Sequence, residues 1–100
     1  MGRLADEMYE TAKGLHDIGL LSQSKMDEVT VLYNNIPKYD AEQIKELRAK
    51  TSFSQTAFAK LLNVSPSSIR QWESGAKKPD GASRKLLQLL EAHGVSAFLV

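Results

Sequence analysis

The stretch FSQTAFAKLLNVSPSSIRQWESG, residues 53–75, decides the fold. It contains two short runs with helical apolar spacing. A serine, which is among the preferred N-cap residues, stands before each run, at Ser54 and at Ser65. The spacing therefore predicts a helix over 54–62 and a second helix over 65–74, joined by a tight turn.

Both predicted helices carry stop signals. Asn63 suits the left-handed backbone conformation that closes many helices, and Gly75 adopts it without steric cost. Pro66 stands at the first position of the second helix, where the N–H that proline lacks has no helical partner to lose. The positions predicted to face inward on the first helix are Ala57, Phe58, Leu61 and Leu62.

The second helix of the pair has two unlike faces. Ile69 and Trp72 lie three positions apart and are expected to face a core. The outward positions are then Ser67, Ser68, Arg70, Gln71 and Ser74. Gln71 can pair with an adenine edge through two hydrogen bonds, and Arg70 can reach guanine or phosphate. This spacing fits a DNA-reading helix and equally an ordinary short helix with a solvated polar face.

Two further helices are predicted around this pair, over 40–50 and over 81–93. Asp40 is a good N-cap for the first of them, and Gly94 stops the second. The remaining tail, 95–100, is short and apolar.

The N-terminal third has weaker signals. Apolar residues recur every three or four positions over 4–18, which predicts an amphipathic helix, and Gly19 is a suitable stop. A second short helix is preferred over 24–33, although its β-branched residues also permit a strand. Residues 34–39 break the periodicity and are predicted to be a linker.

The composition fits one small domain with an appendage. The chain has 100 residues, of which 42% are hydrophobic and 25% are charged. It has no cysteine, which excludes disulfides and thiolate metal sites. No stretch approaches the roughly 20 apolar residues that span a bilayer. We therefore expect a soluble, cytoplasmic protein that does not bind membranes.

The net charge of +1 is unevenly distributed. Residues 1–40 hold four basic and seven acidic side chains, a balance of −3, and residues 41–100 hold nine and five, a balance of +4. Such asymmetry favours a basic face for a polyanion and an acidic segment for another partner. Charged runs are nevertheless more often simply solvated faces.

The sequence contains no recognisable catalytic or metal-binding set. His16 and His93 stand in different segments without a convergent Asp, Glu or Ser spacing, and the helix dipole explains a histidine at a helix C-terminus. There is no glycine-rich phosphate loop and no nucleophile elbow. We expect neither an enzyme nor a bound cofactor or metal.

Residues 53–65 and 68–75 together closely resemble the XRE family of Cro/repressor-type helix-turn-helix proteins. The shared pattern is an apolar-Ser-Gln start, an alanine four residues later, an apolar-Ser turn, and an isoleucine before an aromatic-Glu-x-Gly ending. Asn63 departs from the usual glycine but tolerates the same backbone region. The resemblance implies an all-α fold: a repressor-like five-helix DNA-binding domain with an N-terminal helical extension.

The resemblance also implies roles for single positions. Gln55 matches a residue that hydrogen-bonds a DNA phosphate and supports the recognition helix, and Arg48 with Glu73 matches a structural ion pair. The positions that match base-contacting or backbone-approaching residues of the family are Pro66, Ser67, Gln71, Lys77 and Lys78. Ser68 and Arg70, from the outward face, complete the predicted DNA-binding set.

The N-terminal segment, with two stretches near the C-terminus, resembles one subgroup of this family. Residues 8–20, 79–82 and 86–91 are similar to HigA-type antitoxins and neighbouring regulators. In that group the helix-turn-helix autoregulates the operon while another segment wraps a RelE-like ribonuclease toxin. An acidic amphipathic helix suits a basic toxin surface. Packing on the core or on a second subunit explains residues 4–33 as well, and the two explanations are compatible.

We therefore expect a partner-binding or dimerising extension at 1–36, a DNA-binding domain at 37–94 and an apolar tail at 95–100. The expected function is autorepression by a dimer on a palindromic operator, because one short helix reads few base pairs. The dimer contact is the tail or the N-terminal apolar stripe. The alternative is an interaction module that neutralises a RelE/HigB-like toxin without specific DNA binding.

Overall fold

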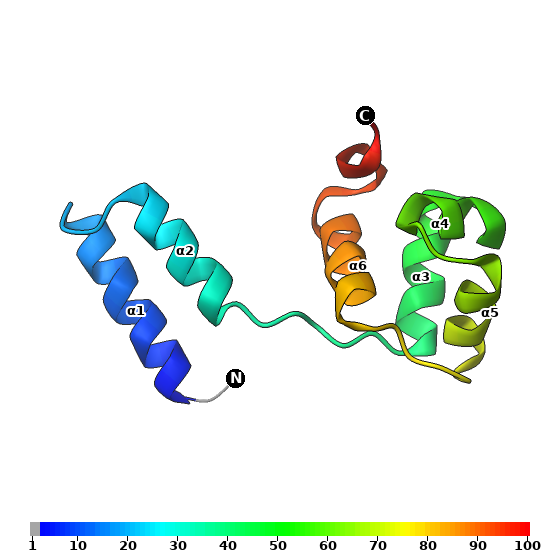
Figure 1. Cartoon of the computed structure of the whole chain (residues 1–100), viewed down its shortest axis with the longest axis horizontal. Helices are drawn as coiled ribbons and strands as arrows, with labels where there is room; N and C mark the ends of the chain where they lie inside the picture. The colour runs from blue at the N-terminus through cyan, green and yellow to red at the C-terminus, as the bar shows by residue number, and fades with distance from the viewer. Residues whose placement is uncertain (1–2) are drawn as a thin grey trace. The chain divides into compact units, whose positions relative to one another are not determined.

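A computed structural model describes the backbone of residues 3–100 and the side chains of residues 6–100. Every regular element within that range is helical, so the expectation of an all-α chain is confirmed for the part described. The chain forms two compact units, Met1–Asn35 and Ile36–Val100 (Figure 1).

The first unit is a pair of helices, α1 (Arg3–Asp17) and α2 (Gln23–Tyr33), that pack against each other (Figure 1). Gly19 takes a positive φ of 83° in the connection, as its predicted role as a stop requires. The Ser22 hydroxyl accepts the N–H of Lys25 at 3.2 Å and so caps α2. The preferred helix over 24–33 is confirmed, and the strand alternative is wrong.

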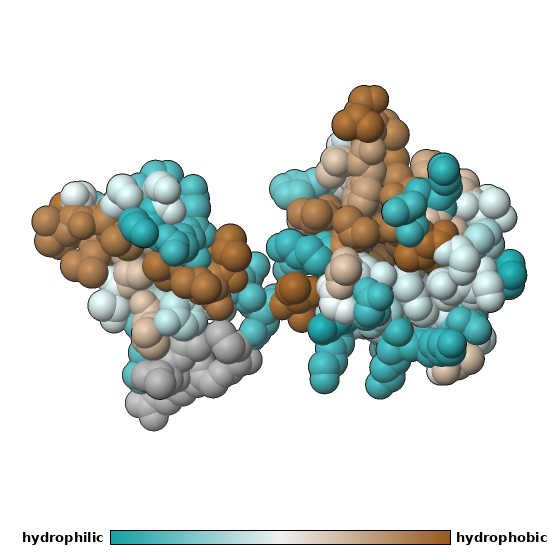
Figure 2. All heavy atoms as spheres, viewed as in Figure 1, coloured by the Kyte–Doolittle hydropathy of each residue, from teal (hydrophilic) through white to brown (hydrophobic). Residues whose placement is uncertain are grey.

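The two-helix unit has almost no core of its own. Met26, at 7% exposure, is the one buried residue among its described side chains. Its exposed large apolar residues are Met8, Leu15, Ile18, Leu20, Val31 and Leu32. The hairpin therefore presents much of its apolar surface to solvent, and hydrophobic residues are visible over it in Figure 2.

The second unit has four α-helices and a short terminal 3₁₀ helix. These elements are α3 (Ala41–Thr51), α4 (Gln55–Leu62), α5 (Pro66–Ser74), α6 (Gly81–His93) and η1 (Val95–Phe98). The fifth helical segment expected of the domain is thus a 3₁₀ turn within the apolar tail. Val95 and Phe98 pack against the core from this turn.

Three helices of this unit begin at the predicted caps, Asp40, Ser54 and Ser65, and α6 begins at Asp80, a cap that was not predicted from the sequence. Asp40, Ser54, Ser65 and Asp80 each accept the backbone N–H of the residue three positions later, at 2.8–3.1 Å. Asn63 closes α4 in the left-handed conformation, with φ 57°. Local hydrogen bonding therefore fixes where each helix starts, before any long-range packing is considered.

The core of the second unit lies between α3, α4, α5 and α6. Its buried apolar residues are Tyr39, Ile44, Leu47, Phe58, Ala59, Leu62, Ile69, Trp72, Leu87 and Leu90. One inward prediction on α4 is wrong, because Ala57 is exposed and Ala59 is buried at 1% exposure. Phe58, Ala59 and Leu62 share one face at helical spacing, and Ala57 falls beside that face.

Among the helices from Arg3 onward, none has the combination of length and apolar character that is needed to cross a bilayer.

Candidate nucleic-acid interface

Helix α5 has one face buried against the domain and an opposite face exposed to solvent. Ile69, Trp72 and Glu73 are buried at 0%, 6% and 6% exposure, and the helix packs against α3 and α4. On its other side Ser67 and Arg70 are exposed. A side chain on this outward face can meet a ligand without disturbing the packing behind it.

A buried carboxylate fixes the carboxyl-terminal half of α5. Glu73 accepts two hydrogen bonds from Arg48 of α3, from Nε at 2.7 Å and from Nη2 at 2.9 Å. Arg48 also donates from Nη1 to the backbone carbonyl of Phe53 at 3.1 Å. This paired geometry ties α3 and the α3–α4 turn to α5, and it gives directional strength that a single lysine contact lacks.

Gln55 joins this group at the amino end of α4. Its side-chain amide donates to Glu73 Oε1 at 3.2 Å. The hydrogen bond from Arg48 lowers the pKa of Glu73, against the effect of burial, and the bond from Gln55 lowers it further. The hydrogen bond between Arg48 and Glu73 also raises the pKa of Arg48. Glu73 is therefore an ionised carboxylate with its acceptors turned into the protein.

The amino end of α5 is ordered by its serines. The Ser65 hydroxyl accepts the Ser68 N–H at 3.1 Å, and the two hydroxyls share a hydrogen bond of 2.9 Å. Pro66 occupies the first helical position, and both Pro66 and Ser68 are half-buried. The Ser68 hydroxyl is thus engaged within the cap, whereas Ser67 beside it is exposed.

The carboxyl end of α5 closes in a left-handed glycine turn. Gly75, with φ 80°, donates its N–H to the Trp72 carbonyl at 3.3 Å, and the Lys77 N–H donates to the Gln71 carbonyl at 3.2 Å. This closure places the exposed residues Lys77 and Lys78 in the loop directly after the helix. The half-buried Gln71 lies in the helical turn before the closure.

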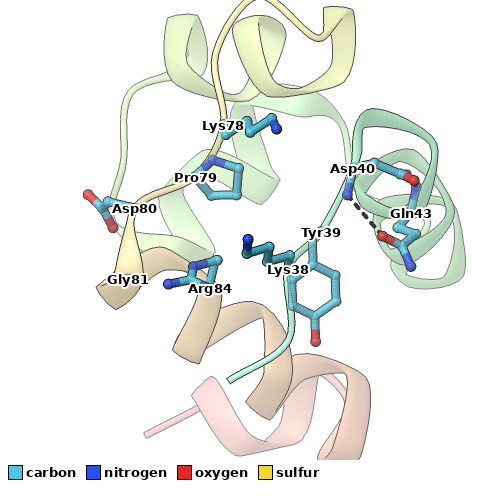
Figure 3. A pocket seen from close by; sticks show the side chains of 9 residues that line it. All are labelled: Lys38, Tyr39, Asp40, Gln43, Lys78, Pro79, Asp80, Gly81 and Arg84. Atoms are coloured by element: carbon cyan, nitrogen blue, oxygen red, sulfur yellow. Dashed lines mark hydrogen bonds between the residues drawn. The ribbon is translucent and has the colours of Figure 1, made fainter. Parts of the chain in front are cut away.

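The predicted DNA-binding residues lie on α5, in the loop that follows it and at the amino end of α4. Ser67, Arg70 and Gln71 are on α5, Lys77 and Lys78 follow it, and Gln55 contacts it through Glu73. Sequence reasoning missed the contribution of the Phe53 carbonyl to holding Arg48, since a backbone acceptor leaves no side-chain signal. It also missed Lys38 and Arg84, which line one pocket with Lys78 (Figure 3).

The described side chains bring together no group of three or more His, Asp or Glu residues that could hold a metal ion.

The chain is similar in sequence to known helix-turn-helix proteins. Residues 44–99, more than half of the chain, match the helix-turn-helix family model HTH_3. The uncharacterized HTH-type transcriptional regulator YiaG of Escherichia coli K12 is 28% identical over 88 residues, which cover 88% of this chain and 86% of the relative. Antitoxin HigA-2 of Vibrio cholerae serotype O1 is 27% identical over 90 residues, with 88% and 86% covered. The range that matches the family runs from α3 into the tail and contains the whole α4–α5 pair.

Proposed function

Because the chain belongs to the helix-turn-helix family HTH_3, we propose that it is a DNA-binding transcriptional regulator that reads an operator with α5. The observation that carries the proposal is the division of this helix into two faces. Ile69, Trp72 and Glu73 hold it against the domain, and its polar face is open. A helix fixed in this way can present side chains to the major groove without reordering the core.

In the proposed complex Ser67 and Gln71 read bases from successive turns of α5. A glutamine amide can donate to and accept from an adenine edge, and a small serine permits close approach to the groove. Arg70 reaches guanine or a phosphate. Pro66 has no N–H donor, so its contact is with a thymine methyl group or with groove shape. Ser68 acts chiefly through the cap, because its hydroxyl is already bonded to Ser65.

Phosphate contacts position the helix in this proposal. Gln55 uses one amide hydrogen on Glu73, which leaves a second donor and the free backbone N–H groups at the start of α4 for a phosphate. Lys77 and Lys78 approach the backbone from the loop after α5. Arg48 and Glu73 do not touch DNA, and they hold α3 and α5 together.

The test is selection of a preferred duplex from a pool of random sequence by the full chain. Gln71→Ala should then relax preference at one base position in each half-site, at a cost of about 1–3 kcal/mol there. Lys77→Ala should weaken binding to every sequence alike and flatten its salt dependence. Lys50→Ala, at the carboxyl end of α3, is the matched control and should change neither.

Two outcomes would contradict the assignment of α5. One is a uniform loss of affinity across all sequences in Gln71→Ala. The other is a wild-type chain that enriches no sequence over the starting pool.

We also propose that the protein works as a dimer, since two half-sites multiply the few base pairs that one α5 can read. The contact tested first is the apolar tail, where Leu99 is 70% exposed, and the exposed apolar side chains of the hairpin are the alternative. Light scattering after size-exclusion chromatography tests this. Leu99→Lys should yield a monomer, and a dimer that persists in Leu99→Lys but disappears on deletion of residues 1–35 would move the contact to the hairpin.

A second function is favoured by the hairpin. An open apolar groove of about 550 Å³ lies between α1 and α2, lined by residues that include Met8, Leu15 and Leu32. Residues 1–35 hold three basic and six acidic side chains, a net charge of −3. An apolar groove on an acidic hairpin suits a basic protein partner. Since the relative in Vibrio cholerae is named an antitoxin, we propose a small basic toxin of the RelE/HigB kind as this partner.

Co-expression with the products of the adjacent genes tests the second function. Leu32→Glu should abolish a complex seen by size-exclusion chromatography, because Leu32 lines the groove. Val31→Glu is the control, since Val31 is similarly exposed on α2 and does not line the groove. Equal behaviour of the two variants would argue against the groove, and a wild-type chain that forms no such complex would argue against the antitoxin function.

A further inference from the structure

A pocket of about 420 Å³ lies beside the loop that follows α5 (Figure 3). It is formed by the amino ends of α3 and α6 and by this loop, which meet at one end of the second unit (Figure 1). Three basic residues line it from three separate segments: Lys38 from the linker before α3, Lys78 from the loop and Arg84 from α6. The pocket therefore gathers positive charge that is dispersed in the sequence.

Across the described side chains of residues 6–100, no ion pair within 4.0 Å involves Lys38, Lys78 or Arg84. The charge of Arg84 does act on Asp80, since it adds to the lowering of the Asp80 pKa that the backbone N–H of Ser83 chiefly causes. Asp40 and Asp80 also line the pocket, but each is engaged as a helix cap by a backbone N–H at 2.8 Å. The Asp80 carboxylate points away from the pocket in Figure 3. The lining side chains carry three positive charges against two negative ones, and the two carboxylates are offset by the helix N-termini that they cap.

The residues that carry these cations are held in place. Tyr39, next to Lys38, is 5% exposed and donates its hydroxyl to Glu91 Oε1 of α6 at 2.9 Å. Pro79, next to Lys78, is buried. The backbone at both lysines is thus fixed before a ligand arrives, which lowers the entropy cost of binding.

We propose that this pocket binds a phosphate group of the DNA backbone, at a position that flanks the bases read by α5. The inference rests on the proposed DNA binding and adds Lys38 and Arg84 to the contact surface. A guanidinium, which can donate to two phosphate oxygens at once, and two ammonium groups match the chemistry of a phosphodiester. The contact carries no sequence information and sets the orientation of the domain on the duplex.

The place of the pocket in the chain favours a backbone phosphate over a free anion. Lys78 lies four residues after the end of α5 and directly follows Lys77. When α5 enters the major groove, this loop meets the strand that borders the groove. The pocket lies on the same side as the loop and is open to solvent, so a duplex can reach it without any rearrangement of the fold.

The test measures the affinity of the full chain for a random-sequence duplex over a range of salt concentrations. One phosphate contact contributes about 0.9 to the slope of log affinity against log salt. The double variant Lys38→Gln/Arg84→Gln should lose about 0.9 in slope and, relative to 1 M salt, about eightfold in affinity at 0.1 M. Arg84→Lys should retain most of the affinity because it keeps the charge.

Lys50→Gln is the matched control for Lys38→Gln, since Lys50 is an exposed lysine in the last turn of α3 and Lys38 is an exposed lysine just before its first turn. Its affinity should change by less than about twofold. Thermal unfolding followed by circular dichroism shows whether each variant is folded. The proposal is overturned if the folded double variant has the slope of Lys50→Gln, or if it loses affinity for some sequences only.

A free anion is distinguished in a separate arm. Inorganic pyrophosphate is titrated into the full chain while backbone amide NMR signals of Lys78 and Arg84 are followed. Strong shifts, together with DNA affinity that is unchanged in the double variant, would overturn the assignment to DNA. A wild-type chain with no affinity for any duplex would refute the proposed function itself, whereas wild-type binding with an unchanged double variant would refute only the pocket.

Discussion

The two units of the chain differ in how much of their apolar surface they bury. Residues 36–100 bury ten apolar side chains in one cluster, six of them with less than 2% exposure. Residues 1–35 bury Met26 and leave large apolar residues in solvent. Burial of a large apolar side chain contributes about 1.5–3 kcal/mol, so the second unit can stabilise itself and the first cannot match it. The exposed apolar surface of the hairpin is the observation that supports the proposed binding of a protein partner there.

The largest expected effect tests whether the core belongs to the second unit alone. Phe58→Ala should destabilise that unit by about 3–5 kcal/mol, because Phe58 is fully buried. Met26→Ala should leave its unfolding unchanged. Trp72, the single tryptophan, lies in the core of the second unit, so its fluorescence during urea unfolding reports on this unit alone. If Met26→Ala lowers the stability of the second unit, as followed by Trp72 fluorescence, the two units do not have separate cores and the comparison is wrong.

A slightly smaller effect tests the buried ion pair. Arg48→Met leaves the Glu73 carboxylate buried without its main partner and should cost about 3 kcal/mol, near the low end for such pairs because a quarter of Arg48 remains in solvent. The double variant Arg48→Met/Glu73→Met should recover much of this loss, because it removes the unpaired charge. If the double variant is less stable than Arg48→Met alone, the account of the pair is wrong.

The same pair predicts an acid dependence. The Arg48 hydrogen bond holds the pKa of Glu73 below its ordinary value of 4.5 in the folded state. The stability that this gives is therefore present above pH 4.5 and is lost as the pH falls below it. Urea unfolding of the wild type should show this loss, and Arg48→Met/Glu73→Met should show less of it. An equal loss in both would assign the acid sensitivity to other carboxylates.

The smallest effect tests where the second unit begins. Tyr39→Phe removes the hydrogen bond to Glu91 and should cost about 1 kcal/mol. Burial, with the Glu91 contact, raises the pKa of Tyr39 from 10.0 to about 12. Its contribution is therefore complete below pH 10 and is lost as the pH rises from 10 to about 12. Wild type and Tyr39→Phe should converge over that interval, and parallel curves would contradict this.

Local chemistry explains why so much of the second unit could be predicted. Caps such as Ser54 and Ser65, and the positive-φ positions Asn63 and Gly75, are determined by neighbouring residues. The prediction that Ala57 faces inward was wrong because alanine occurs on both buried and exposed faces, so an apolar run does not show which way it points. The hydrogen bond between the Ser65 and Ser68 hydroxyls depends on side-chain rotamers, which the sequence pattern does not predict.

Long-range geometry explains what the sequence could not predict. Lys38, Lys78 and Arg84 meet only because Tyr39 and the loop after α5 bring distant segments to one end of the fold. No periodic pattern links the three positions. Family resemblance predicted the ion pair of Arg48 and Glu73 and a supporting role for Gln55, whereas the hydrogen bond by which Gln55 reaches Glu73 required the structure.

The most direct test of the account compares the full chain with residues 36–100 on a duplex that carries one half-site of the selected sequence. A single half-site removes any contribution of dimer contacts to binding. The account predicts that both proteins prefer the half-site over a scrambled duplex by the same factor, since α5 and its supports lie wholly within the second unit. A full chain that discriminates between the duplexes, beside a folded second unit that binds both alike, would contradict it.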